Sequence, residues 1–253
     1  MREILKNLLK RLGLLKHYCF LRYGLKYKIK AALNPQVNFY TLSPDLLIAL
    51  NSCLRKAQSL RILDGTDYLE FGLFRGFSFW YAQAAAQEMK ASDMRFFGFD
   101  SFQGLPELEG IDERSGFSKG VFKAGHTLVV NFLTQYGVNW DKTFLIEGFY
   151  SDSLNDETKK QHSFRKCSIC VVDSDLYESA KDVLSFVAPL LNDKSFIIFD
   201  DWNCNQSDDT QGERKAFAEF LERNPNIKSE PYGQFGNNCQ AFLLEKQVSL
   251  LNS

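Results

Sequence analysis

Two apolar runs that each end in acid decide the predicted fold: S-I-C-V-V-D-S-D at residues 168–175 and S-F-I-I-F-D-D-W at residues 195–202. Both are rich in β-branched and aromatic residues, and neither has a charged residue before its last positions. Such runs are typical of strands that are buried on both faces of a parallel sheet. The segment 178–191 between them has a helical pattern, so the sequence predicts one βαβ unit.

Acidic side chains gather where the two predicted strands end. Ligands of parallel sheets bind beyond the carboxyl ends of the strands, and these ends carry Asp173, Asp175, Asp200 and Asp201. Four neighbouring carboxylates repel one another unless a cation lies among them. Mg²⁺ prefers such oxygen ligands. We therefore expect a divalent cation here, rather than four aspartates that only cap the following helices.

Composition is that of one globular α/β domain. The chain has 253 residues, 45% of them hydrophobic and 24% charged, and a net charge of −1. This charge gives no reason to expect a nucleic-acid partner. The sequence has no run of about 18 apolar residues and no secretory signal pattern at its start. Its six cysteines are scattered, and we expect buried cysteines and a cytoplasmic protein.

The first 42 residues form a predicted basic arm or lid ahead of a domain at 43–253. Residues 1–30 contain nine Lys or Arg and one acid, which gives +8 and leaves −9 for the remainder. Apolar residues at helical spacing alternate with lysines in this arm. Two interpretations stay open: peripheral contact with a membrane surface, or packing on the active site or on a second subunit of a homo-oligomer.

The remaining pattern alternates strands and helices. We expect helices at 43–59, 78–90, 127–136 and 212–222, and strands at 68–71, 95–99, 143–147, 227–230 and 240–244, the last two as an antiparallel pair. The irregular segment 101–125 is long for a compact domain, which favours a lid or binding loop.

The turn Y-L-E-F-G-L-F-R-G at residues 68–76 predicts a nucleotide-like ligand. Gly72 would let the ligand approach the backbone, and Gly76 would let the following helix pack closely. Asp100, at the end of the next strand, is placed to accept hydrogen bonds from ribose hydroxyls. Phe74 fills the position where dinucleotide folds prefer glycine, and Glu70 adds negative charge. Both favour the cationic S-adenosylmethionine over NAD, although a tight turn needs glycine in any case.

Five blocks of the sequence carry a resemblance to a known family. They are Y-L-E-F-G-L-F-R-G (68–76), F-G-F-D-S-F-Q-G-L-P-E (97–107), E-G-F-Y-S-D-S-L (147–154), V-D-S-D-L-Y (172–177) and I-F-D-D-W (198–202), followed by Gly212-Glu213. In order and spacing they resemble the macrocin O-methyltransferase (TylF/MycF-like) family from about residue 68 to 222. No matching motif precedes residue 40.

This resemblance implies an S-adenosylmethionine- and Mg²⁺-dependent enzyme that methylates a sugar hydroxyl. The implied fold is the α/β, Rossmann-like class I methyltransferase fold: a seven-stranded, mostly parallel sheet with an antiparallel last strand and helices on both faces. Asp173, Asp200 and Asp201 map to the metal ligands, and Asp175 maps to the base or a substrate contact. The expected cofactor site comprises Glu70, Phe71, Gly72, Arg75, Gly76, Ser78, Asp100, Ser101, Gly148 and Asp173.

The chemistry itself asks for a base. A sugar hydroxyl is a poor nucleophile until its proton is withdrawn, and a cation that binds two vicinal hydroxyls would lower the pKa of one of them. Asp175 is the first candidate base and His126 the second. The acceptor is expected to be a glycoside, glycan or nucleotide sugar. Three alternatives stay open: a catechol-like acceptor, a non-catalytic nucleotide-binding protein of the same fold, and a hydride-transferring enzyme.

Overall fold

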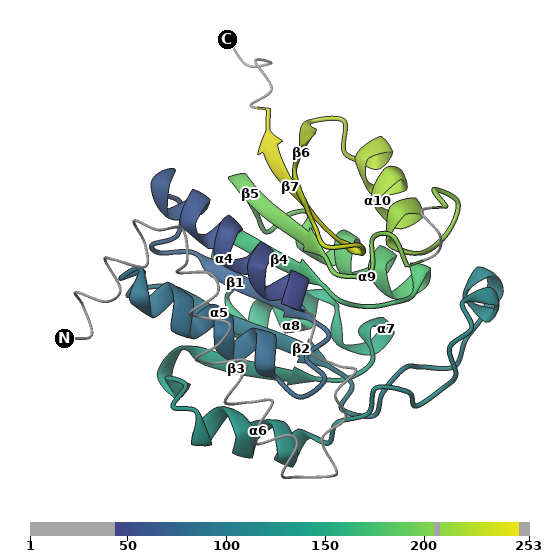
Figure 1. The fold of residues 1–253 in the computed structure, drawn as a ribbon, viewed down its shortest axis with the longest axis horizontal. Coiled ribbons are helices and arrows are strands. Elements are labelled where there is room, and N and C mark those ends of the chain that lie inside the picture. Colours follow the sequence, from purple (N-terminus) through teal and green to yellow (C-terminus); the bar gives the residue numbers. More distant parts are fainter. Residues whose placement is uncertain (1–43, 205–207, 248–253) are drawn as a thin grey trace. The chain divides into compact units, whose positions relative to one another are not determined.

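The computed structural model describes residues 44–204 and 208–247, and those from Asp45 onward belong to one compact unit. The predicted basic arm and the cap at Ser43 lie outside the described residues. Seven strands form one sheet in the order β3-β2-β1-β4-β5-β7-β6 (Figure 1). The strands are β1 (Asp67–Phe71), β2 (Arg95–Asp100), β3 (Thr143–Glu147), β4 (Cys167–Val172), β5 (Leu191–Phe199), β6 (Ile227–Phe235) and β7 (Cys239–Lys246).

Strands β1 to β5 pair in parallel, and β7 lies antiparallel between β5 and β6. All six residues of β4 are buried, which agrees with its uninterrupted apolar sequence. Cys167 and Cys170 in this strand are free and buried. The predicted α/β fold, including the antiparallel last strand, is confirmed.

Helices cover both faces of the sheet (Figure 1). They are α4 (Pro44–Ser59), α5 (Phe77–Glu88), α6 (His126–Gln135), α7 (Tyr150–Ser153), α8 (Asp156–His162), α9 (Tyr177–Val187) and α10 (Gly212–Arg223), with short 3-10 helices at Gly110–Arg114 and Trp140–Lys142. Alternation along β1 separates the faces. Tyr68 meets Phe79 of α5, whereas Phe71 packs on Phe99 and on Phe186 of α9.

Several predicted boundaries were wrong. The helix expected at 178–191 ends at Val187, and β5 begins at Leu191 and runs for nine residues instead of starting at 195. Residues 150–162 were not expected to be helical, yet they form α7 and α8. His162 ends α8, with its ring 5.9 Å from that of Phe97. Short polar helices such as α8 have no apolar face for periodicity to detect.

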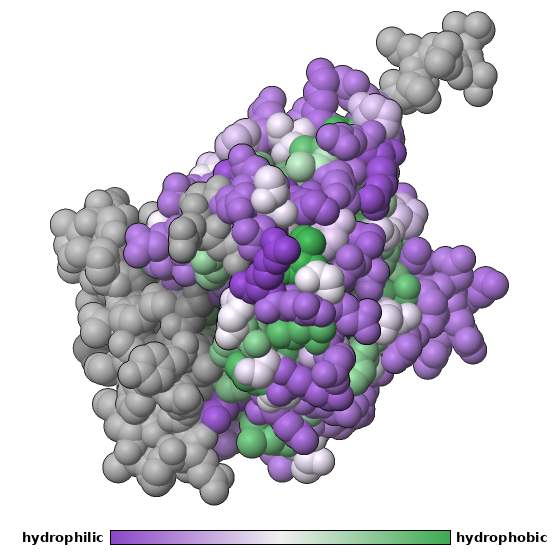
Figure 2. All heavy atoms as spheres, turned by 90° about the vertical axis from the view of Figure 1, so that its right-hand side faces the viewer, coloured by the Kyte–Doolittle hydropathy of each residue, from purple (hydrophilic) through white to green (hydrophobic). Residues whose placement is uncertain are grey.

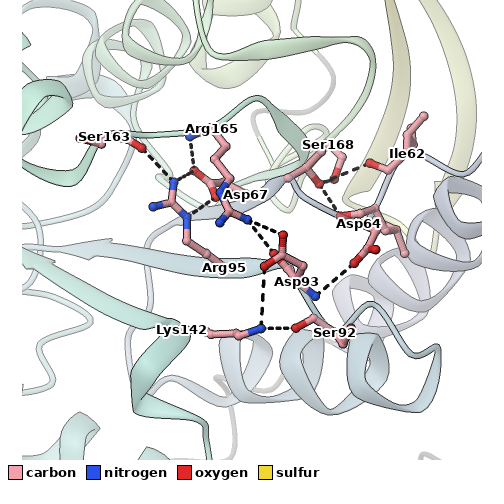
Figure 3. A network of polar contacts seen from close by, with 12 residues as sticks. Ile62, Asp64, Asp67, Ser92, Asp93, Arg95, Lys142, Ser163, Arg165 and Ser168 are labelled. Carbon is pink, nitrogen blue, oxygen red and sulfur yellow. Dashed lines mark hydrogen bonds and ion pairs between the residues drawn. The ribbon is translucent and has the colours of Figure 1, made fainter.

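A polar network joins the amino-terminal ends of the strands, which lie opposite the acid-bearing carboxyl ends (Figure 3). Asp67, fully buried in β1, accepts two hydrogen bonds from the guanidinium of Arg95 in β2, at 2.8 and 2.7 Å. It also accepts one from the backbone N–H of Arg165, just before β4. The carboxylate of Asp67 therefore joins the amino-terminal ends of three neighbouring strands.

Among the described residues, no helix combines the length and the apolar character needed to cross a bilayer.

Candidate functional site

Two acid-bearing turns meet at the carboxyl ends of β4 and β5. Val172 is paired with Phe199 in the parallel register, so the residues that follow them emerge side by side. Asp173, Asp175 and Asp201 each offer a carboxylate oxygen, and these oxygens lie within 4.8 Å of one another. All three residues are half-buried. This is a hard-oxygen donor set of the kind that Mg²⁺ prefers, so the residues present fit a divalent cation.

The set differs in one member from the predicted metal ligands. Asp175 belongs to it, whereas Asp200 does not. Successive residues at a strand end point in opposite directions. The negative charge of Asp200 accordingly affects the pKa values of two further groups. It raises the pKa of buried Glu70 and of Cys239. Asp200 nevertheless remains near Asp173, because after burial it is the largest cause of that residue's raised pKa.

Asp175 is held in an unusual conformation. Its φ is +58°, in the left-handed region, which costs energy for a residue other than glycine and is often found at functional sites. Its carboxyl shares a hydrogen bond with Asp201, and its pKa is raised by burial first and then by the charge of Asp201. Burial likewise raises the pKa of Asp173. The two turns thus bring several half-buried carboxyl groups together.

Glu213, which received no role from the sequence, lies against the same turns. It is the second residue of α10 and is 2% exposed. Its Oε2 accepts a hydrogen bond from the backbone N–H of Asp201 at 3.2 Å. Burial, followed by the charges of Asp201, Asp200 and Asp175, raises its pKa well above the usual value. Its signal in the sequence was the Gly212-Glu213 pair that follows the five blocks of the family resemblance.

Cys204 borders the group from the solvent side. This exposed residue donates a hydrogen bond through its thiol to Oδ1 of Asp201 at 2.9 Å. Trp202, between the two, packs on Phe199, Phe217 and Phe242. Its ring therefore supports the core beneath the β5–α10 turn.

The glycine turn follows β1, the strand next to β4. Glu70 is fully buried in β1, where its Oε1 accepts a hydrogen bond from Ser78 at 2.5 Å and its other oxygen accepts one from Tyr68. Burial raises the pKa of Glu70 to about 7, and the two hydrogen bonds oppose that rise. Glu70 and Ser78 thus lie together at the start of α5, as the predicted cofactor site requires.

The two glycines of the turn are required by protein contacts. Gly72 has φ +92°, and a Cβ at this position would lie 1.8 Å from the carbonyl oxygen of Asp173. A Cβ on Gly76, at φ +78°, would lie 3.1 Å from Val129 and 3.3 Å from Leu133 of α6. Gly76 thus allows close packing against α6, whereas the sequence predicted close packing of the following helix, α5. At Gly72, the atom that approaches the backbone is the carbonyl oxygen of Asp173.

Asp100 is occupied by backbone groups. Its Oδ2 accepts hydrogen bonds from the N–H groups of Leu73 and Phe74 at 2.8 and 3.0 Å, and its Oδ1 accepts one from Phe102 at 2.6 Å. Burial raises its pKa, and these three bonds oppose the rise. In this structure Asp100 fixes the shape of the glycine turn, and contact with a ribose stays a prediction.

Four other predicted residues lie around this turn. Ser101 starts the long loop, and its hydroxyl bonds the carbonyl of Gly104. The N–H of Gly148 joins the end of β3 to the carbonyl of Asp100. The guanidinium of Arg75 lies 5.1 Å from the ring centre of Phe74. The side chain of Phe71, in contrast, is fully buried in the core, so only its backbone lies at the turn.

His126, the second candidate base, begins α6. Its ring lies 4.8 Å from that of Phe102 in an edge-on contact, on the helix that packs against Gly76. This places it beside the glycine turn and the long loop. His126 does not belong to the group formed by Asp173, Asp175 and Asp201.

The loop at 101–125 extends to the right of the sheet in Figure 1. Its Phe122 is 40% exposed and meets Phe74 of the glycine turn and Phe117 of the loop itself. Figure 2 looks onto the right-hand side of Figure 1, where hydrophilic atoms predominate and hydrophobic atoms show in the middle of the face. The aromatic side chain of Phe122 in the loop thus borders the glycine turn.

Comparison with known proteins gives one curated relative. It is the 8-demethyl-8-(2,3-dimethoxy-alpha-L-rhamnosyl)-tetracenomycin-C 4'-O-methyltransferase of Streptomyces olivaceus, which is 27% identical over 142 residues. The alignment covers 54% of this chain, and the chain spans about half, 52%, of the length of that relative.

Solved structures share the fold. The O-methyltransferase NovP matches with a TM-score of 0.65, 18% identity and 81% of each chain covered. CalS11, a TDP-rhamnose 3'-O-methyltransferase, matches with a TM-score of 0.57, 20% identity and coverage of 78% of this chain and 77% of its own. An O-methyltransferase from Bacillus cereus matches with a TM-score of 0.58, 14% identity and coverage of 92% and 97%.

The family model of the macrocin O-methyltransferases (TylF) matches residues 27–231, which is most of the chain and includes every acid-bearing turn described above. The resemblance inferred from the five sequence blocks is confirmed, and the chain belongs to the macrocin O-methyltransferase family.

Proposed function

We propose that this protein is an S-adenosylmethionine- and Mg²⁺-dependent O-methyltransferase that methylates a sugar hydroxyl of a glycoside, glycan or nucleotide sugar. The observation that carries the proposal is the meeting of Asp173, Asp175 and Asp201 within 4.8 Å, one strand away from the glycine turn at Gly72. The relatives support the acceptor class, because two of them are named for methylation of a rhamnose unit.

Each cluster has a distinct task in this proposal. Bound S-adenosylmethionine would supply the methyl group, and Mg²⁺ held by Asp173 and Asp201 would make the acceptor hydroxyl more acidic. Asp175 accepts the proton of that hydroxyl, because it lies beside both ligands and burial favours its protonated form. Glu70 and Ser78 shape the start of α5, and the amino terminus of a helix suits a carboxylate.

The role of Asp200 can be separated from that of Asp175. If Asp200 is a third ligand, as the family resemblance implies, Asp200→Asn weakens Mn²⁺ binding and abolishes turnover. Asp175→Asn as a base variant abolishes turnover and leaves Mn²⁺ binding within a few fold. Both variants should bind S-adenosylhomocysteine within a few fold of wild type. The reverse pattern of metal binding would exchange the two roles.

The decisive experiment combines calorimetry with a product screen. The full chain is titrated with S-adenosylhomocysteine, S-adenosylmethionine and NAD, with Mg²⁺ and with EDTA, and then incubated with nucleotide sugars, glycosides and catechols. We expect tight binding of S-adenosylhomocysteine, none of NAD, and a sugar product 14 mass units heavier, an increase set by replacing H with CH₃. Absence of S-adenosylhomocysteine binding refutes the proposal. Near-normal turnover in EDTA refutes the metal, and methylation of catechols alone refutes the sugar.

A further inference from the structure

Glu213 lies against both acid-bearing turns. Its Oε2 accepts a hydrogen bond from the backbone N–H of Asp201 in the turn after β5. The backbone N–H of Ser174, between Asp173 and Asp175 in the turn after β4, approaches the same carboxyl and lowers its pKa. Because both of these donors are backbone groups, the side chain acts on the position of the chain itself on each side.

The second oxygen of Glu213, Oε1, has no hydrogen-bond partner among the described residues. In the described part of the chain, three buried side-chain polar atoms lack a hydrogen-bond partner: Gln83 Nε2, Ser174 Oγ and Glu213 Oε1. Two of the three therefore belong to residues that approach each other at the carboxyl ends of β4 and β5. A buried acceptor without a donor is destabilising, and more so when it is charged. These two unpartnered atoms indicate a ligand or a water in the native site.

The surroundings restrict what that partner is. Asp175, Asp200 and Asp201 are the charged neighbours of Glu213, so the partner of Oε1 has to be a donor or a cation. Glu213 does not belong to the three residues whose oxygens lie within 4.8 Å of one another. It therefore stands beside the candidate metal position. Mg²⁺ keeps several waters when it binds proteins, and acids outside the ligand set commonly orient such waters and ligands.

We propose that Glu213 is a positioning residue of the metal centre. Oε2 holds the backbone of Asp201, and the carboxyl lies against the backbone of Ser174, so that the ligand carboxylates converge, and Oε1 accepts a hydrogen bond from a water of the cation's hydration shell. This inference rests on the proposed function, since it requires that the three carboxylates hold a cation. It assigns a task to a residue outside the predicted ligand set.

Glu213→Gln is the variant that separates the two oxygens. Glutamine retains one oxygen for the backbone N–H of Asp201, but it replaces the other oxygen by an NH₂ group, which repels a cation and cannot accept a hydrogen bond. Glu222→Gln, an exposed position of the same helix, is the matched control. Mn²⁺ affinity is measured on the full chain by electron paramagnetic resonance, and the melting temperature is measured in EDTA and in Mg²⁺.

The expected result has two parts. Glu213→Gln melts in EDTA no lower than wild type, because a buried charge among acids has been removed, and it binds Mn²⁺ at least tenfold more weakly with a smaller Mg²⁺-induced rise in melting temperature. Glu222→Gln behaves like wild type in both. Unchanged Mn²⁺ affinity overturns the inference. A variant that melts lower in EDTA or fails to fold also overturns it, because Glu213 is then structural alone. If wild type itself binds neither metal, the proposed metal site fails first.

Discussion

Asp112 caps a helix that starts 65 residues later: its Oδ1 accepts the backbone N–H of Tyr177 at 2.8 Å. Its Oδ2 accepts the next N–H, that of Glu178, at 3.0 Å. The residue at the N-cap position of α9 is Leu176, which provides no side-chain acceptor. Asp112 is buried within the long loop. The loop is therefore tied to the helix that follows the candidate base Asp175.

Replacing Asp112 by alanine should affect both stability and acceptor binding. Loss of the cap is expected to cost about 1–2 kcal/mol, measured by urea denaturation. Because the loop loses its attachment near Asp175, KM for the acceptor should rise several-fold more than the dissociation constant of S-adenosylhomocysteine. Glu113→Ala, its exposed neighbour, is the control and should change neither. Equal changes in acceptor and cofactor binding would indicate a purely global effect.

Gly72→Ala should damage the site through the backbone. The added Cβ would meet the carbonyl oxygen of Asp173 at 1.8 Å, a contact that no side-chain rotation relieves. Gly116→Ala is a matched control, because that glycine is also left-handed, at φ +80°, with nothing within 4 Å of its Cβ. The control should lose about 1 kcal/mol. Gly72→Ala should lose several times more, together with Mn²⁺ binding. Similar losses in the two variants would contradict the close contact with β4.

The metal-free protein should lose stability as the pH rises. The pKa of Glu70 is raised from 4.5 to about 7 in the folded state, chiefly by burial. Its contribution is thus fully present below pH 4.5 and lost once the pH passes about 7. At about 1.4 kcal/mol per pH unit, the loss is about 3 kcal/mol. About 2 kcal/mol of this loss falls between pH 5.5 and the folded-state pKa of about 7, so urea midpoints in EDTA at pH 5.5 and 8 should differ by about that amount.

Glu70→Gln isolates this contribution, because the other raised carboxylates remain in place. The variant should show a smaller decrease between the two pH values, whereas the exposed Glu107→Gln should not. Asp173, Asp175 and Glu213 shift in the same direction. Mg²⁺ should therefore stabilise more at pH 8 than at pH 5.5. A metal-free wild type that is more stable at pH 8 would contradict the sign.

The buried ion pair of Asp67 and Arg95, at the amino-terminal ends of β1 and β2, should affect the free energy of unfolding and not cofactor binding. Asp67→Ala leaves Arg95 and the N–H of Arg165 without their shared acceptor (Figure 3). Breaking a buried pair in this way costs about 3–5 kcal/mol. The exposed pair of Lys119 and Glu107, 2.6 Å apart, is the control, and its loss should cost less than about 1 kcal/mol. Below the unfolding transition, cofactor affinity of Asp67→Ala should equal that of wild type.

The order of the elements could be predicted from the sequence, because a strand that is buried on both faces has an uninterrupted run of apolar residues. The run ending at Asp173 and the run ending at Asp200 predicted β4 and β5, and parallel pairing then required that their acidic ends meet. The family blocks predicted the antiparallel last strand. Short helices such as α8 were not predicted, because their sequences lack a periodic pattern of apolar residues.

The composition of the site was decided by tertiary structure. Which carboxylates converge depends on backbone torsions in the turns, such as φ +58° at Asp175, and these torsions are fixed by partners far along the chain. Glu213 reaches both turns from α10. Asp112 reaches α9 from the long loop. The sequence by itself determined the fold and the edge at which the acids gather, because both follow from local burial patterns. Only the folded chain selected the acids that face one another, because that choice depends on hydrogen bonds between segments that are distant in sequence.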